Sequence, residues 1–86
     1  MFTGTKILNA DSNSSVLFSD AEFVRLFGRS FNRNVDVVLA MSGDGEDIPV
    51  HVEGCTYLGN SKSVYVTFDR IWEVSIRINY LVVLAE

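Results

Sequence analysis

Residues 26–39 read Leu-Phe-Gly-Arg-Ser-Phe-Asn-Arg-Asn-Val-Asp-Val-Val-Leu, and in this stretch a helical pattern gives way to a strand pattern. Upstream, Phe23 and Phe27 begin an apolar face at helical spacing. Downstream, residues 35–41 are β-branched or apolar at nearly every position, which is typical of a strand covered on both faces. This change of pattern predicts that a helix is followed by a mainly β domain.

The start of the helix is marked by a capping box. Ser19 and Glu22 have the spacing at which a serine hydroxyl accepts a hydrogen bond from the third helical amide, and Phe18 and Phe23 flank them as a hydrophobic staple. We predict a helix over residues 19–33, ended by asparagines that tolerate a left-handed turn.

Alternating apolar residues predict short strands from residue 34 to the end of the chain. The turn signals are residues 42–47 and 59–62, and a tight turn near residues 78–80 is expected to divide the last segment. We therefore predict a single domain over residues 1–86, in which a strongly bent five-stranded antiparallel sheet forms a small barrel. Residues 1–18 are expected to be an N-terminal extension or a small hairpin.

The last strand is apolar on both faces although it ends the sequence. An exposed edge of this kind pairs readily with another chain. We therefore expect copies of the protein to associate in a homo-oligomeric ring. The candidate subunit interface is Leu81, Val82, Val83 and Leu84.

The composition limits the function classes. The chain has 86 residues, 48% of them apolar, and a net charge of −4, which disfavours binding to duplex DNA. Cys55 is the single cysteine, and no metal site or cofactor is expected. No signal peptide or membrane-spanning run is apparent, so we expect a soluble cytoplasmic protein without membrane contact. No catalytic motif occurs, so we predict no catalytic residues and no enzyme activity.

Two stretches resemble the signatures of the Sm/LSm (Hfq-like) family. Residues 26–39 resemble the family's helix, basic linker and first strand. The second signature is matched by Ile76, Arg77, Asn79, Val82 and Leu84. The resemblance implies an Sm-like ring whose pore binds single-stranded RNA in RNA metabolism or regulation. Another small barrel, such as an SH3-like one, is the alternative fold.

The same resemblance implies the RNA-binding residues. Arg77 would stack on a base or pair with a phosphate, and Asn79 and Asn60 would bond to base edges. Lys62 would supply charge, and Tyr57 would supply a stacking surface.

Arg25, Arg29 and Arg33 recur every four residues. They fit either a second RNA surface or the solvated face of an amphipathic helix.

Two other functions fit the sequence. The first is a small acidic protein-interaction module or inhibitor without nucleic-acid binding, encoded by a phage or another mobile element and directed at a host protein. The second is a purely structural assembly subunit.

Overall fold

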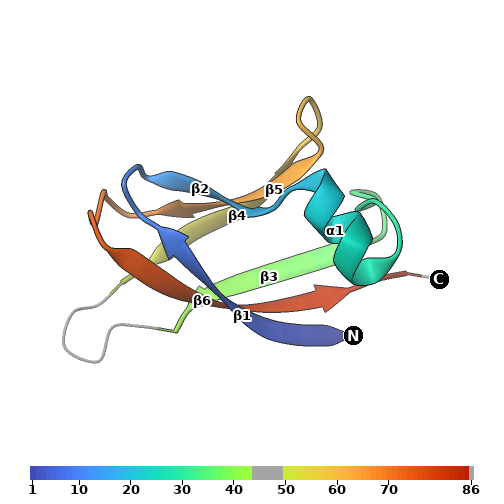
Figure 1. Ribbon diagram of the computed structural model, residues 1–86, viewed down its shortest axis with the longest axis horizontal. Helices are drawn as coiled ribbons and strands as arrows, with labels where there is room; N and C mark the ends of the chain where they lie inside the picture. The colour runs from blue at the N-terminus through green and yellow to red at the C-terminus, as the bar shows by residue number, and fades with distance from the viewer. Residues whose placement is uncertain (44–49, 86) are drawn as a thin grey trace.

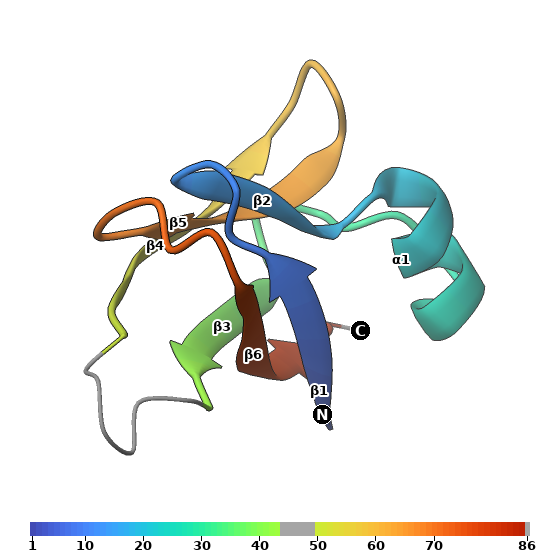
Figure 2. The same ribbon diagram turned by 60° about the vertical axis from the view of Figure 1, so that its left-hand side comes forward.

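The computed structural model describes residues 1–43 and 50–85, which form two three-stranded antiparallel sheets and one helix (Figure 1). The first, which we call sheet A, has the strand order β1 (Phe2–Asn9), β6 (Ser75–Val83), β3 (Val37–Ser42). The second, sheet B, has the order β2 (Ser14–Phe18), β5 (Ser63–Phe68), β4 (Val52–Leu58). Helix α1 (Asp20–Phe27) lies at one end of the two sheets (Figure 2).

The core lies between the sheets, because inward positions alternate with exposed ones along the strands. In β6 the burial alternates from Ser75 to Asn79, so that Ile76 and Ile78 are buried. The fully buried large side chains are Phe18, Phe23, Phe68, Leu17, Ile78, Val66 and Val82. The mainly β prediction is therefore confirmed.

Helix α1 begins where the sequence predicts. Ser19 is the N-cap, and its Oγ accepts a hydrogen bond from the Glu22 amide at 3.2 Å. The predicted end at residue 33 is wrong. The helix stops at Phe27, because Gly28 adopts φ 87° and its N–H donates to the Val24 carbonyl at 2.8 Å.

The N-terminal residues belong to the sheets and do not form an extension or a hairpin with each other. β1 pairs with β6, and β2 pairs with β5, so the chain crosses between the sheets after Asn9. Lys6 fixes this arrangement, because its ammonium group contacts the Glu22 carboxylate and the Leu17 carbonyl. The helix is consequently preceded by two strands and is not N-terminal.

The predicted closed five-stranded barrel is also wrong. Six strands are found, and the sheets are not joined by backbone pairing between β3 and β4 within the described residues. β6 runs unbroken from Ser75 to Val83, without the turn predicted near residues 78–80. Most of the turn predicted at residues 42–47 lies outside the described residues.

The last strand is not an open edge. β6 is the middle strand of sheet A, where it pairs with β1 along one side and with β3 along the other. Val82 faces the core and is fully buried, whereas Leu81, Val83 and Leu84 are half-buried. The continuous apolar pattern thus reflects a central strand, and the premise of the predicted subunit interface is wrong. In the described chain, no helix has the length and apolar character that crossing a membrane requires.

Candidate functional site

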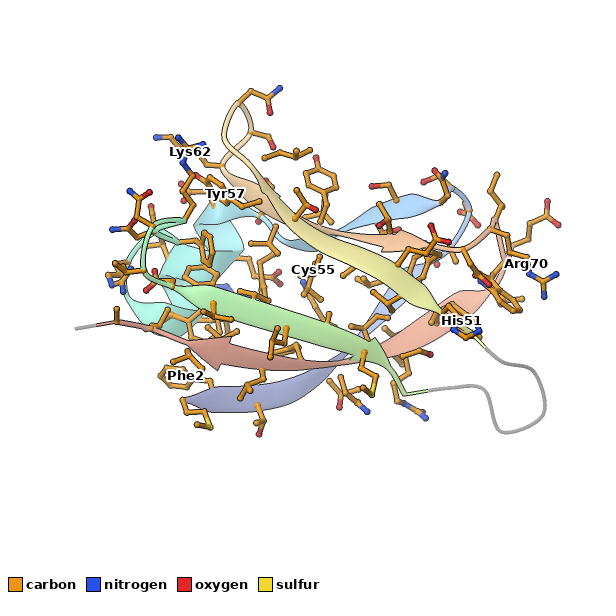
Figure 3. The ribbon with its side chains drawn as sticks, turned by 180° about the vertical axis from the view of Figure 1, so that it is seen from behind. Phe2, His51, Cys55, Tyr57, Lys62 and Arg70 are labelled. Carbon is orange, nitrogen blue, oxygen red and sulfur yellow. The ribbon has the colours of Figure 1, made fainter. Side chains whose placement is uncertain are left out.

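The candidate site lies where an edge strand of sheet A faces an edge strand of sheet B without pairing with it in the described chain. β3 is an edge of sheet A and β4 is an edge of sheet B, and these two strands contact each other. No backbone hydrogen bond links them among residues 1–43 and 50–85. We call the space between the facing edges of β3 and β4 the seam (Figure 3).

The register shows which peptide groups of β3 face the seam. The Gly43 N–H donates to the Arg77 carbonyl at 2.8 Å, so Gly43 and Arg77 form a hydrogen-bonded pair. Hydrogen-bonded pairs alternate with non-bonded pairs along antiparallel strands, so Met41 and Leu39 also form backbone hydrogen bonds with β6. The peptide groups of Val38 and Ala40 therefore point away from β6 and into the seam.

The register of β4 and β5 shows which peptide groups of β4 face the seam. The Phe68 N–H donates to the Asn13 carbonyl at 2.8 Å, which directs the peptide groups of Phe68 toward β2. Its neighbour Thr67 must then bond to Gly54 of β4. Cys55, the next residue along β4, directs its peptide groups to the opposite side, which is the seam.

An apolar groove lies along the seam, with a volume of ≈ 820 Å³. Small residues make it hollow, because Ala40 and Gly54 occupy lining positions where larger side chains would fill the space. Cys55 points into the seam (Figure 3), and burial raises the pKa of its thiol. Tyr80 forms part of the wall and packs edge-on against Phe18, with ring centroids 4.9 Å apart.

The other face of β3 is apolar and exposed. Leu39 is 57% exposed and Met41 is 73% exposed, and Val37 lies on the same outer face. β3 thus has the composition of a strand covered on both faces, yet within the described chain its outer face is exposed, and no backbone hydrogen bond joins its second edge to β4.

A second depression, which we call the basic pocket, lies between the turn after α1 and the end of β4. It has a volume of ≈ 600 Å³ and is lined by Arg29, Ser30, Phe31, Asn32, Arg33, Tyr57 and Gly59. The Phe31 and Tyr57 rings lie with centroids 5.0 Å apart, at 36° to each other.

Arg29 and Asp36 form an ion pair beside the basic pocket. The Arg29 guanidinium donates to both carboxylate oxygens of Asp36, and it also donates to the Ser30 and Ala85 carbonyls. The Arg29 hydrogen bonds hold the pKa of Asp36 well below its usual range, against the opposing effect of burial. The same pairing raises the pKa of Arg29.

The predicted RNA-binding residues do not form one site. Arg77 and Asn79 lie on the outer face of sheet A near Gly43, where the Asn79 side chain accepts a hydrogen bond from the Thr5 hydroxyl at 2.9 Å. Asn60 and Lys62 lie in the turn between β4 and β5, which belongs to the other sheet.

The structure brings together residues that the sequence assigned to different surfaces. Tyr57, from the RNA-binding set, shares the basic pocket with Arg29 and Arg33. Lys62 lies in the turn that follows β4, at the same end of the molecule as Tyr57 (Figure 3). Arg25 is not a lining residue and contacts Glu22 at 3.7 Å.

The sequence pattern does not predict the seam. The available signal was the uninterrupted apolar run at residues 35–41, which predicted a strand covered on both faces but not the absence of its cover. In the part of the chain that the structure describes, no group of three or more His, Cys, Asp or Glu side chains is arranged to hold a metal ion.

Comparisons with protein-family models, with curated proteins and with solved structures find no match. The Sm-like resemblance therefore depends on the sequence alone.

Proposed function

We propose that this protein is a non-enzymatic interaction module that binds an extended segment of a partner protein in the seam. The observation that carries the proposal is the position of β3. Its residues are apolar on both faces, yet it lies at a sheet edge with its outer face exposed in the described chain. An exposed apolar edge strand favours pairing with another strand.

Peptide groups that face the seam define the chemistry of the partner. Val38 and Ala40 on β3 and Cys55 on β4 direct backbone donors and acceptors into it, as the register of each sheet requires. A second polypeptide backbone in an extended conformation satisfies such a row of groups. Strand addition to a sheet edge is an established mode of peptide recognition, in which the main chain supplies the affinity.

The groove defines the side chains of that segment. Alternate residues of a strand added to β3 would enter the groove near Ala40 and Cys55, and the others would lie beside Leu39 and Met41 on the outer face. Both environments favour apolar side chains. Glu53 is exposed on β4 and the net charge is −4, so basic residues flanking the segment would be favoured over acidic ones.

An extended segment suits the seam better than a folded second copy. Every strand of the described chain already belongs to a three-stranded sheet, so an intact copy offers no isolated strand. β4 lies alongside β3 and would obstruct the approach of a whole sheet edge.

Selection of random decapeptides against the protein tests the proposal. A selected peptide is expected to bind and to protect the Val38 and Ala40 amides from hydrogen exchange. Ala40→Pro should abolish binding while the protein stays folded, because this N–H has no partner in β6 and proline is tolerated at such edge positions.

Two exposed residues of sheet A provide a matched comparison. Leu39→Lys places a charge next to the seam, whereas Ile7→Lys changes a residue of similar exposure, 64%, on β1 at the far edge. Binding should be lost in the first variant and retained in the second. Failure to select any peptide, or equal binding by all variants, would contradict the proposal.

The Sm-like ring that binds single-stranded RNA remains a prediction. Its main support was an open edge on the last strand, but both edges of β6 are paired within the chain. Light scattering after size-exclusion chromatography tests it, and a monomer at micromolar concentration would contradict the ring.

A further inference from the structure

We propose a second binding site, independent of the seam: the basic pocket binds a nucleotide, with its base against Tyr57 and its phosphate between Arg33 and Lys62. The proposal is based on three features of the pocket, namely its aromatic wall, its charges and its open side.

The aromatic wall is held in place by the core. Tyr57 packs against Phe31, and Phe31 packs edge-on against the buried Phe23 of α1, with centroids 5.7 Å apart at 87°. Both Tyr57 and Phe31 are only half-buried. A planar base can therefore stack on a ring whose orientation is already fixed. Stacking on an aromatic ring is a common way in which proteins bind nucleotides whatever the identity of the base.

The charged side chains that line the pocket are positive. They are Arg29 and Arg33, and Lys62 follows in the turn after Gly59, whereas the acidic residue Asp36 lies just beyond the lining segment. Asp36 is engaged by Arg29 and by the N–H groups of Asn32 and Ala85, so its charge is compensated.

The other two basic residues have no such compensation. Arg33 and Lys62 are exposed, and neither has an ion pair or a hydrogen bond with any described residue. A phosphate is the anion that an arginine and a lysine beside an aromatic ring recognise well.

The open side is provided by Gly59. A Cβ at this position would lie 3.9 Å from the Tyr57 ring and would meet nothing else within 4 Å. The glycine thus leaves the flank of the ring accessible. The pocket volume of ≈ 600 Å³ is within the range of sites that hold small ligands.

A base linked to a phosphate can come from a free nucleotide or from a single-stranded nucleic acid. Titrations followed by the amide resonances of residues 29–33 and 57–62 would use AMP, UMP and hexauridylate, with uridine and inorganic phosphate as partial ligands. The nucleotides should bind more tightly than either partial ligand. Tighter binding of hexauridylate than of UMP would identify a strand as the source, and equal binding would identify the free nucleotide.

Three variants test the assigned roles. Gly59→Leu should weaken binding by roughly fivefold or more, since it obstructs the stacked base without removing a charge. The double variant Arg33→Gln/Lys62→Gln should reduce the affinity for AMP to that for the nucleoside. Arg25→Gln is the control, because this exposed arginine lies outside the pocket and is already paired with Glu22.

Binding of inorganic phosphate as tight as that of AMP would overturn the proposal, as would unchanged binding by the Gly59→Leu variant. Neither result would affect peptide binding at the seam, so the two sites are tested separately.

Discussion

Arg29 holds Asp36 through two hydrogen bonds, of 2.6 and 2.7 Å, one to each carboxylate oxygen. Asp36 also accepts from the N–H groups of Asn32 at 2.8 Å and Ala85 at 2.9 Å. These contacts fix the turn after α1 to the residues that follow β6. The Asp36 side chain is fully buried, whereas that of Arg29 is 39% exposed, so the carboxylate depends on the pair more than the guanidinium does.

Replacing Arg29 should therefore destabilise the protein strongly. Arg29→Met leaves a buried carboxylate without its main partner, and we expect the free energy of unfolding at pH 7 to fall by several times more than it does when a surface ion pair is broken. Urea denaturation measures this change. Arg25→Met is the control, because Arg25 contacts Glu22 at 3.7 Å on the surface, where such a pair contributes about 0.5 kcal/mol. Similar costs for the two variants would contradict the buried role of the Arg29 pair.

The ion pair also predicts a dependence of stability on pH. Hydrogen bonds from Arg29, and then from Asn32 and Ala85, lower the pKa of Asp36, whereas burial opposes this. Because the folded pKa lies below the unfolded value of about 3.9, this stabilisation is fully present above that value. It is lost as the pH falls through the range between the unfolded and folded pKa values.

Urea denaturation between pH 2 and pH 7 tests this dependence. The unmodified protein should lose stability below about pH 4 more steeply than Asp36→Asn, which has no charge to protonate at this position. Equal slopes would show that other carboxyl groups cause the acid sensitivity.

The parts of the fold that local sequence determines could be predicted. Ser19 and Glu22 are three residues apart, and their capping contact forms as expected. The strand character of residues 35–41 was also evident, because β-branched residues dominate it. The end of the helix is also determined locally, by the left-handed conformation of Gly28, but the apolar spacing that continues to Phe31 predicts a longer helix.

Long-range pairing could not be predicted in the same way. Phe2 lies opposite Val82 in the register of β1 and β6, and nothing in either segment specifies a partner so distant in the sequence. Without β1, the apolar C-terminal segment looked like an open edge. The basic pocket could not be predicted for the same reason, namely that local sequence does not specify long-range contacts. Arg33 and Tyr57 become neighbours only when the turn after α1 packs against the end of β4.

The N-cap contact gives a third prediction. Ser19→Ala removes the hydroxyl that accepts the Glu22 N–H, so the free energy of unfolding should fall by about 1 kcal/mol. Chemical denaturation of this variant can be compared with that of Ser30→Ala, which changes an exposed serine beyond the helix. A decrease in the free energy of unfolding that is confined to Ser19→Ala supports the role of the cap, and equal decreases in the two variants would contradict it.

The contact between Gly4 and Tyr80 gives the last prediction. Gly4 lies opposite Tyr80 in the register, and a Cβ at Gly4 would overlap the Tyr80 phenol ring. The ring packs against the buried Phe18, so it has little space to move. Gly4→Ala should therefore lower the free energy of unfolding by roughly 1 to 3 kcal/mol, as overpacking does in other cores.

A double-mutant cycle can separate this steric effect from a general effect of replacing glycine in a strand. Tyr80→Leu removes the overlapping atoms, so adding Gly4→Ala to that variant should cost much less than it costs alone. Gly59→Ala serves as the control, because the added methyl group would be at an ordinary contact distance from Tyr57. Additive costs for Gly4→Ala and Tyr80→Leu would show that the close approach of β1 to Tyr80 is not what requires glycine at this position.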